Sequence, residues 1–176
     1  METTNASNAY EVAQQAADVV VKKFGGSHDV LAVLGSGWAH AASVLEATRE
    51  ISVTEIPGFV KPSAIGHGGT LKSVTVGKSR VLLLTGRTHL YEGHGVNSVV
   101  HAVRTAAFAG CKTVVLTNAA GCLREDWGVG ATAIISDHIN LTGFSPLTGA
   151  DAPAPLHGRF VDLTDAYSQR LRTIAK

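Results

Sequence analysis

The chain reads RVLLLTGRTHLYEG over residues 80–93, an apolar run followed directly by a polar one. Residues 80–85 have the continuous apolar character of a buried strand. The polar part brings a guanidinium, an imidazole, a phenol and a carboxylate into one short segment. Arg87 suits a phosphate because its planar fork donates two parallel charge-assisted hydrogen bonds. The stretch therefore predicts a buried strand that ends at an anion site.

Alternating helix-type and strand-type patterns surround this stretch. We expect strands at 30–34, 51–56, 70–76, 80–85, 113–117 and 131–136. We expect helices at 8–24, 38–46, 97–110 and 162–176, and a loop at 142–158, which is rich in Gly, Pro and Ala. This mixture predicts an α/β fold, with a central sheet covered by helices on both faces. Ligands of such folds bind at the carboxyl ends of the strands.

Two further loops follow expected strands, GSG at 35–37 and NAAG at 118–121. Backbone amides and the hydroxyl of Ser36 suit a phosphate, although Gly-Ser-Gly is often only a turn. If the three strand ends lie side by side, the three loops converge into one pocket. His67 lies between glycines and is either a site histidine or an exposed loop histidine. Arg87 and His89 are either an anion clamp or a surface pair.

Composition limits the class of protein. The 176 residues are 45% hydrophobic and 16% charged, which predicts one globular domain over residues 1–176. The formal charge of +1 gives no electrostatic footprint for nucleic acid or an anionic membrane. No apolar run reaches the length of a membrane span, and residues 1–10 lack a signal core. Cys111 and Cys122 make no disulfide framework, so a cytoplasmic location is expected.

Neither metal chemistry nor serine hydrolysis is favoured. The chain has eight histidines, and His89 and His94 are five apart, but no spacing matches a zinc site. No metal is therefore expected. Ser36 does not lie in the Gly-x-Ser-x-Gly pattern of a nucleophile elbow.

Six short motifs together resemble one known family. They are LGSG at 34–37, IPGF at 56–59, GHGG at 66–69, GRTHLYEG at 86–93, TNAAG at 117–121 and SDHINL at 136–141. In this order and at this spacing they resemble the trimeric class of purine nucleoside phosphorylase. The resemblance runs from about residue 30 to residue 167, and the actinobacterial members of the family are the most similar.

The resemblance implies a fold and a reaction. The fold would be a three-layer α/β/α arrangement around a mixed, partly barrel-like sheet. The reaction would be the reversible phosphorolysis of purine ribonucleosides and deoxyribonucleosides to a free base and (deoxy)ribose 1-phosphate, in purine salvage. Inorganic phosphate would be a co-substrate, and no cofactor would be needed. The partners would be a purine nucleoside, phosphate and two further subunits of a homotrimer, without nucleic acid or membrane.

The resemblance also implies roles for residues of this chain. The expected phosphate-binding residues are Ser36, His67, Arg87, Thr88, His89 and Ala119. The expected nucleoside-binding residues are Tyr91, Ala120, Gly121 and Phe160, the last reaching the sugar pocket of a neighbouring subunit. The expected catalytic residues are Arg87, His89 and Glu92.

Two departures from the family pattern leave alternatives open. Cys122 stands where the family usually has a second glycine, and the chain ends at Lys176, before the segment that grips the purine in the family. The chain is therefore expected to be C-terminally incomplete, with exposed apolar surface. The alternatives are an inactive phosphate-binding remnant of the family and an enzyme similar to methylthioadenosine phosphorylase. The base preference is not readable.

Overall fold

A five-stranded mixed sheet organises the computed structural model, which describes residues 6–38, 40–60, 69–154, 156, 158 and 160–176. The strands are β1 (Val30–Leu34), β2 (Ala47–Ser52), β3 (Thr70–Val76), β4 (Ser79–Thr85) and β5 (Thr113–Leu116). Their order is β2-β3-β4-β1-β5, with β4, β1 and β5 parallel and β2, β3 and β4 antiparallel. The expected mixed sheet is thus confirmed, and it remains open across the described residues.

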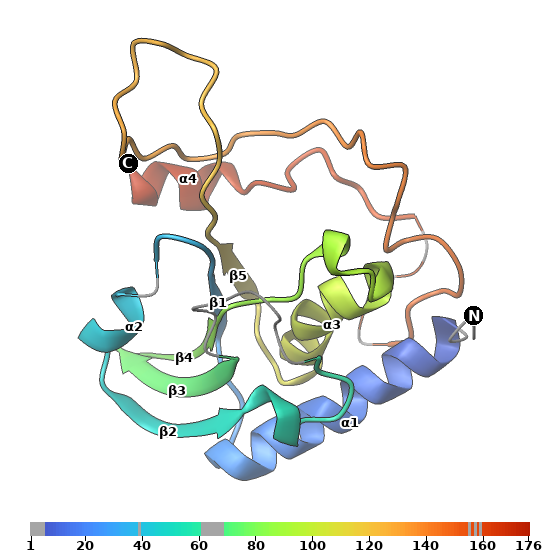
Figure 1. Ribbon diagram of the computed structural model, residues 1–176. Coiled ribbons are helices and arrows are strands. Elements are labelled where there is room, and N and C mark those ends of the chain that lie inside the picture. Colours follow the sequence, from blue (N-terminus) through green and yellow to red (C-terminus); the bar gives the residue numbers. More distant parts are fainter. Residues whose placement is uncertain (1–5, 39, 61–68, 155, 157, 159) are drawn as a thin grey trace.

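The described residues also form four helices and two short 3-10 turns, and Figure 1 shows the helices around the sheet. They are α1 (Ala6–Phe24), α2 (Ala41–Val44), η1 (Val53–Glu55), η2 (Leu90–Glu92), α3 (Gly95–Phe108) and α4 (Gln169–Ala175). None of the described helices combines the length and the apolar character that crossing a membrane would need.

The side chains of each strand point alternately to the two faces of the sheet, and this divides the core into two layers. Leu31 and Val33 of β1, with Leu82 and Leu84 of β4, pack into one buried cluster. The same cluster contains residues of both α1 and α3, including Val20 and Ala106, so these two helices cover this face. Because side chains of a strand point alternately to opposite faces, the period of two commits every second residue to this layer.

The opposite face of the sheet carries the intervening residues. Leu83 of β4 and Val74 of β3 are buried there, with Ala41 and Leu45 at the two ends of α2 packed against them. Helices therefore lie on both faces of the sheet. The expected three-layer α/β/α arrangement is confirmed.

Two arginines of the sheet cap the carboxyl end of α1. The guanidinium of Arg80 donates to the carbonyl oxygens of Phe24 and Ser27 at 2.9 and 2.8 Å. Arg49 donates to the carbonyl oxygen of Lys23 at 2.9 Å. Cations at this end also complement the helix dipole, so both contacts fix α1 against the sheet.

The structure corrects several expected boundaries. The second strand is Ala47–Ser52 and not 51–56, because Ser52 and Glu55 form a capping box that starts η1 at Val53. The helix expected at 38–46 is limited to α2. The helix expected at 162–176 begins only at Gln169, where the hydroxyl of Ser168 accepts the amide of Leu171.

The strand expected at 131–136 was wrong. This run carries no strand in the structure, and Ile134 and Ile135 are 40% and 45% exposed. An apolar run becomes a strand only when a neighbouring strand takes up its backbone hydrogen bonds, and no described strand pairs with this one.

The coil that follows β5 leaves apolar surface exposed, as expected. Figure 1 shows it running outside the sheet and its helices. Its exposed large apolar residues include Leu123, Trp127, Val129, Ile139, Leu141, Phe144, Phe160 and Leu163. One contact to the core is made by Arg104 of α3, which donates to the carbonyl oxygen of Pro146 at 2.9 Å.

A buried histidine couples the core to pH. His28 is 2% exposed, and its Nε2 lies 2.8 Å from the Oγ of Ser73 on β3. Burial, with a smaller contribution from the Arg80 guanidinium, lowers the pKa of His28 from 6.5 to about 4. Between these two values the unfolded chain binds a proton that the folded chain excludes, so stability is lost as the pH falls through this window.

We expect the free energy of unfolding to fall as the pH is lowered from 6.5 towards 4, and His28→Gln to reduce this pH dependence. The measurement is urea unfolding at several pH values. His40→Gln is the matched control, because His40 is exposed and should leave the slope unchanged. Equal slopes for the wild-type chain and His28→Gln would contradict the assignment.

Candidate functional site

Three strand ends meet at one edge of the sheet. β4, β1 and β5 are parallel neighbours, so the loops that follow them leave from the same side (Figure 1). The amide of Gly86 donates to the carbonyl of Leu34 at 3.1 Å, and the amide of Thr117 donates to the carbonyl of Val33 at 3.0 Å. The three polar loops of the sequence therefore begin side by side, as expected from an α/β fold.

The guanidinium of Arg87 rests on the end of β5. Its Nη1 donates to the carbonyl oxygen of Thr117 at 2.9 Å. The hydroxyl of Thr117 accepts the amide of Gly35 at 2.9 Å and donates to the carbonyl of Val33 at 3.1 Å. Arg87, Gly35 and Thr117, from three different loops, thus form one connected group.

Only a glycine fits at position 35, because the atoms around it leave no room for a side chain. A Cβ at this position would collide with Nη1 of Arg87 and with the carbonyl oxygen of Thr117, and would lie 3.1 Å from the Cα of Asn118. The guanidinium can cross this point only because the residue beneath it has no side chain. Ser36 follows directly and is exposed, so its hydroxyl is accessible next to this group.

His89 and Glu92 form a second, tightly bonded pair on η2. The carboxylate Oε1 of Glu92 accepts the amide of His89 at 2.8 Å and lies 3.0 Å from its Nδ1. The Glu92 side chain is only 3% exposed, so the carboxylate is sheltered from water. Because a carboxylate can only accept, Nδ1 donates to Glu92, and this contact orients the imidazole ring. The ring of Tyr91, a residue that is 78% exposed, stacks on His89 at 4.9 Å.

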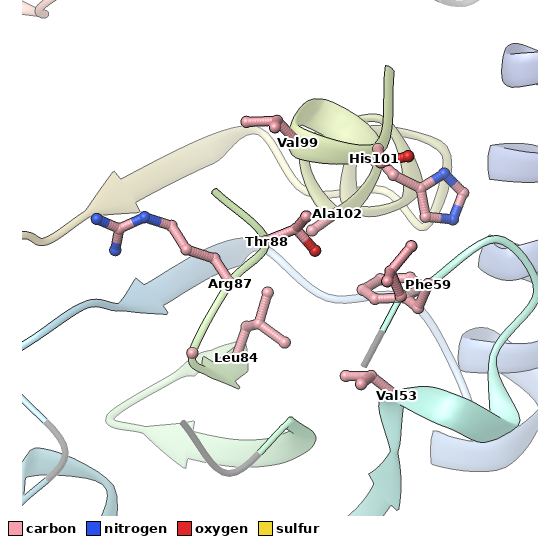
Figure 2. Close-up of a pocket in the computed structure, with 11 residues that line it drawn as sticks. Val53, Phe59, Leu84, Arg87, Thr88, Val99, His101 and Ala102 are labelled. Carbon is pink, nitrogen blue, oxygen red and sulfur yellow. The ribbon is translucent and has the colours of Figure 1, made fainter. Parts of the chain in front are cut away.

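Thr88 lies apart from the guanidinium. Thr88 is only 9% exposed. Its side chain points away from that of Arg87, towards a small hollow between α3 and Phe59 (Figure 2). The hollow is lined mainly by apolar residues, among them Val53, Leu84, Val99 and Ala102. Its volume of ≈ 20 Å³ leaves room for about one water molecule.

The remaining expected site residues are dispersed. Ala119, Ala120 and Gly121 follow β5 and are exposed, so a ligand could reach their backbone. Phe160 is 95% exposed on the coil. His67 lies outside the described residues. The structure therefore places Ser36, Arg87 and Ala119 on neighbouring loops, and the His89–Glu92 pair follows Arg87 along the chain.

Sequence reasoning missed two residues around the site. Thr117 was predicted as the end of a strand and lies in the TNAAG motif, but no role was assigned to it. His101 of α3 was not singled out. It is 5% exposed, its Nε2 donates to the carbonyl of Pro57 at 2.9 Å, and its ring meets Phe59 edge-on at 4.8 Å. Burial lowers the pKa of His101 below its usual 6.5.

The described residues offer no metal-binding cluster. No three side chains of His, Cys, Asp or Glu gather within that part of the chain as a metal site would require. Cys111 is buried and Cys122 is exposed, and neither forms a disulfide. Burial raises the pKa of the Cys111 thiol to about 11, which makes it a poor nucleophile.

Comparison with known proteins identifies the family. A family model described as the phosphorylase superfamily matches residues 29–176. The chain therefore belongs to the phosphorylase superfamily, and its similarity within that superfamily is to purine nucleoside phosphorylases. It is 53% identical over 168 residues to the purine nucleoside phosphorylase of Mycobacterium tuberculosis, a match that covers 94% of this chain and 60% of that protein.

Two more comparisons agree. The chain is 46% identical over 177 residues to the purine nucleoside phosphorylase of Cellulomonas sp, covering 97% of this chain and 60% of that protein. Its fold matches a crystal structure of the purine nucleoside phosphorylase from Schistosoma mansoni in complex with acetate, with a TM-score of 0.85, 30% identity and coverage of 99% and 64%. The expected resemblance, including its actinobacterial character, is confirmed. The chain spans about 60% of the length of these curated relatives.

We expect Glu92→Ala to lower the free energy of unfolding by about 1–3 kcal/mol, because the partly buried amide of His89 loses its charged acceptor. Urea unfolding measures the loss, and hydrogen exchange at the His89 amide should accelerate. Glu50→Ala is the matched control. Glu50 pairs with Lys72 at 3.4 Å but its side chain is 61% exposed, so we expect a change of about 0.5 kcal/mol or less. Similar losses in both variants would contradict this role of Glu92.

Proposed function

We propose that the chain binds inorganic phosphate at the ends of β1, β4 and β5 and uses it in the reversible phosphorolysis of purine ribonucleosides and deoxyribonucleosides. The observation that carries this proposal is the guanidinium of Arg87, held 2.9 Å from the Thr117 carbonyl over Gly35, beside two loops with accessible amides. The names of the similar proteins supply the substrate class, since they are purine nucleoside phosphorylases. The pathway would be purine salvage.

The proposed site suits phosphorolysis because the nucleophile is itself an anion. Breaking the glycosidic bond develops positive charge on C1′ of the sugar, as in glycoside hydrolysis. A phosphate held by Arg87, Ser36 and the amide of Ala119 stabilises this charge and then attacks C1′. Fixing the nucleophile removes part of the entropic barrier, up to roughly 7–11 kcal/mol in the most favourable cases. The bond from C1′ to the purine nitrogen breaks, and the carbon–oxygen bond of the sugar phosphate forms in its place.

His89 and Glu92 suit the accompanying proton transfer. The purine leaves with a proton, and the phosphate gives one up on becoming an ester. His89 would accept that proton, because Glu92 at 3.0 Å orients the ring through Nδ1 and stabilises the imidazolium that forms. Arg87, His89 and Glu92 are therefore the proposed catalytic residues. Thr88 would contribute through its main chain, since its side chain faces the hollow under α3.

The nucleoside would bind on the open side of the phosphate. Tyr91 would contact the ribose, and Ala120 and Gly121 would line the base. Phe160 would enter the sugar pocket of a neighbouring subunit in a homotrimer, a role that its 95% exposure supports. Phosphate is the co-substrate, and the proposed chemistry uses no cofactor or metal. Two cysteines without a disulfide fit a cytoplasmic enzyme.

The test is whether the purified chain cleaves inosine in a phosphate-dependent reaction, which the release of hypoxanthine measures. Methylthioadenosine is the second substrate to be tried. Cleavage of inosine that requires phosphate supports the proposal. Cleavage of methylthioadenosine but not of inosine would show that the chain acts as a methylthioadenosine phosphorylase. Phosphate binding without any cleavage would favour the alternative, a phosphate-binding remnant, which the exposed apolar coil also suits. Absence of phosphate binding would overturn both.

We expect Arg87→Ala to weaken phosphate binding at least roughly tenfold, because hydrogen bonds to a charged group contribute about 1.5–3 kcal/mol each. Isothermal titration with inorganic phosphate measures this directly. Arg170→Ala on α4 is the control, because Arg170 is exposed and remote in sequence from the three loops. Unchanged phosphate binding in Arg87→Ala would remove Arg87 from the site.

A further inference from the structure

Thr117 makes bonds that join all three loops of the site. Its carbonyl accepts Nη1 of Arg87 at 2.9 Å, and its hydroxyl accepts the amide of Gly35 at 2.9 Å. The hydroxyl and the amide of Thr117 both donate to the carbonyl of Val33, at 3.1 and 3.0 Å. One side chain therefore links the ends of β1 and β5, and its main chain holds the arginine from the end of β4.

We propose that Thr117 is a positioning residue that fixes the guanidinium of Arg87 before phosphate arrives. The inference rests on the proposed function and adds a residue to it. Thr117 acts through Arg87 and need not touch the substrate.

The hydroxyl is the part of Thr117 that matters. A hydroxyl can accept a hydrogen bond from the Gly35 amide and, at the same time, donate one to the Val33 carbonyl. β5 is a short edge strand, Thr113–Leu116, paired on one side with β1 among the described residues. Its end therefore depends on local contacts such as these. If the hydroxyl is lost, Thr117 keeps the hydrogen bond from its backbone amide to the Val33 carbonyl but loses both bonds of its side chain.

A fixed guanidinium benefits anion binding. An arginine side chain carries roughly 2 kcal/mol of rotamer entropy, and a side chain that is already ordered loses less of it when the ligand binds. The guanidinium donates to Thr117 with one nitrogen, which leaves other N–H groups of its five to donate to phosphate. Gly35 leaves the space that the fixed guanidinium occupies, because a Cβ there would collide with Nη1 of Arg87.

The first experiment is isothermal titration of the chain with inorganic phosphate, comparing Thr117→Val and Thr117→Ser with the wild type. Valine keeps the shape and removes the hydroxyl, and serine keeps the hydroxyl. We expect Thr117→Val to weaken phosphate binding roughly tenfold, and Thr117→Ser to remain within about threefold of the wild type. Thr113→Val is the matched control, because it makes the same change at the other end of β5 and should leave the affinity unchanged.

The second experiment needs no phosphate. We expect NMR of ¹⁵N-labelled arginine to show hindered rotation and slow exchange at the Arg87 guanidinium in the wild-type chain and in Thr117→Ser, and fast averaging in Thr117→Val. Thermal unfolding of each variant shows whether it remains folded. If Thr117→Val does not fold, the inference is tested by whether the Arg87 guanidinium is hindered in both the wild-type chain and Thr117→Ser.

The outcomes separate the inference from the proposed function. A wild-type chain that shows a fixed Arg87 but binds no phosphate would overturn the proposed function and keep the positioning role of Thr117. Equal phosphate affinity in wild type and Thr117→Val, or a freely averaging Arg87 in the wild-type chain, would overturn the inference. Equal weakening in Thr113→Val would also overturn it, because the effect would then belong to the strand as a whole.

Discussion

The contact between the Arg87 guanidinium and the Thr117 carbonyl, made across Gly35, is the point on which the site depends. It exists because β4, β1 and β5 run parallel and end at the same edge of the sheet. Parallel strands need long crossover connections, and here α3 supplies the one between β4 and β5. Helix packing on one face thus determines which loops meet at the edge.

The two-layer core gives this edge its rigidity, and the coil after β5 has no comparable support. Leu82 and Leu84 are buried against α1 and α3, while Leu123 and Val129 of the coil are fully exposed. The proposed phosphate half of the site lies on the core, and most of the proposed nucleoside half lies on the coil. The proposed phosphate half therefore has a packed core beneath it, and most of the proposed nucleoside half does not.

Local pattern alone determined the main elements of this protein. Residues 30–34 and 70–76 were predicted to the residue, because continuous or alternating apolar residues between glycine turns have one stable arrangement, a buried strand. The polar run 86–93 after such a strand predicted the location of the proposed site, and the order of six motifs indicated the family that the comparisons confirmed. The boundaries at 51–56 and 162–176 failed where a cap decided the helix start, since Ser52 and Ser168 act through side-chain bonds that periodicity does not register.

Tertiary structure decided what depends on neighbours that are distant in the chain. Ile134 and Ile135 have the apolar character of a strand, but a strand needs a partner for its backbone, and no described strand pairs with them. Thr117 looks like an ordinary strand residue until β1 and the Arg87 loop lie beside it. The sequence by itself determined the α/β class and the identity of the chemical groups, because these follow from local pattern and composition, and its six motifs carried the resemblance to the family. Strand order, the Gly35–Arg87–Thr117 contact and the orientation of Thr88 came only from the fold, since each is a relation between segments that sequence spacing does not encode.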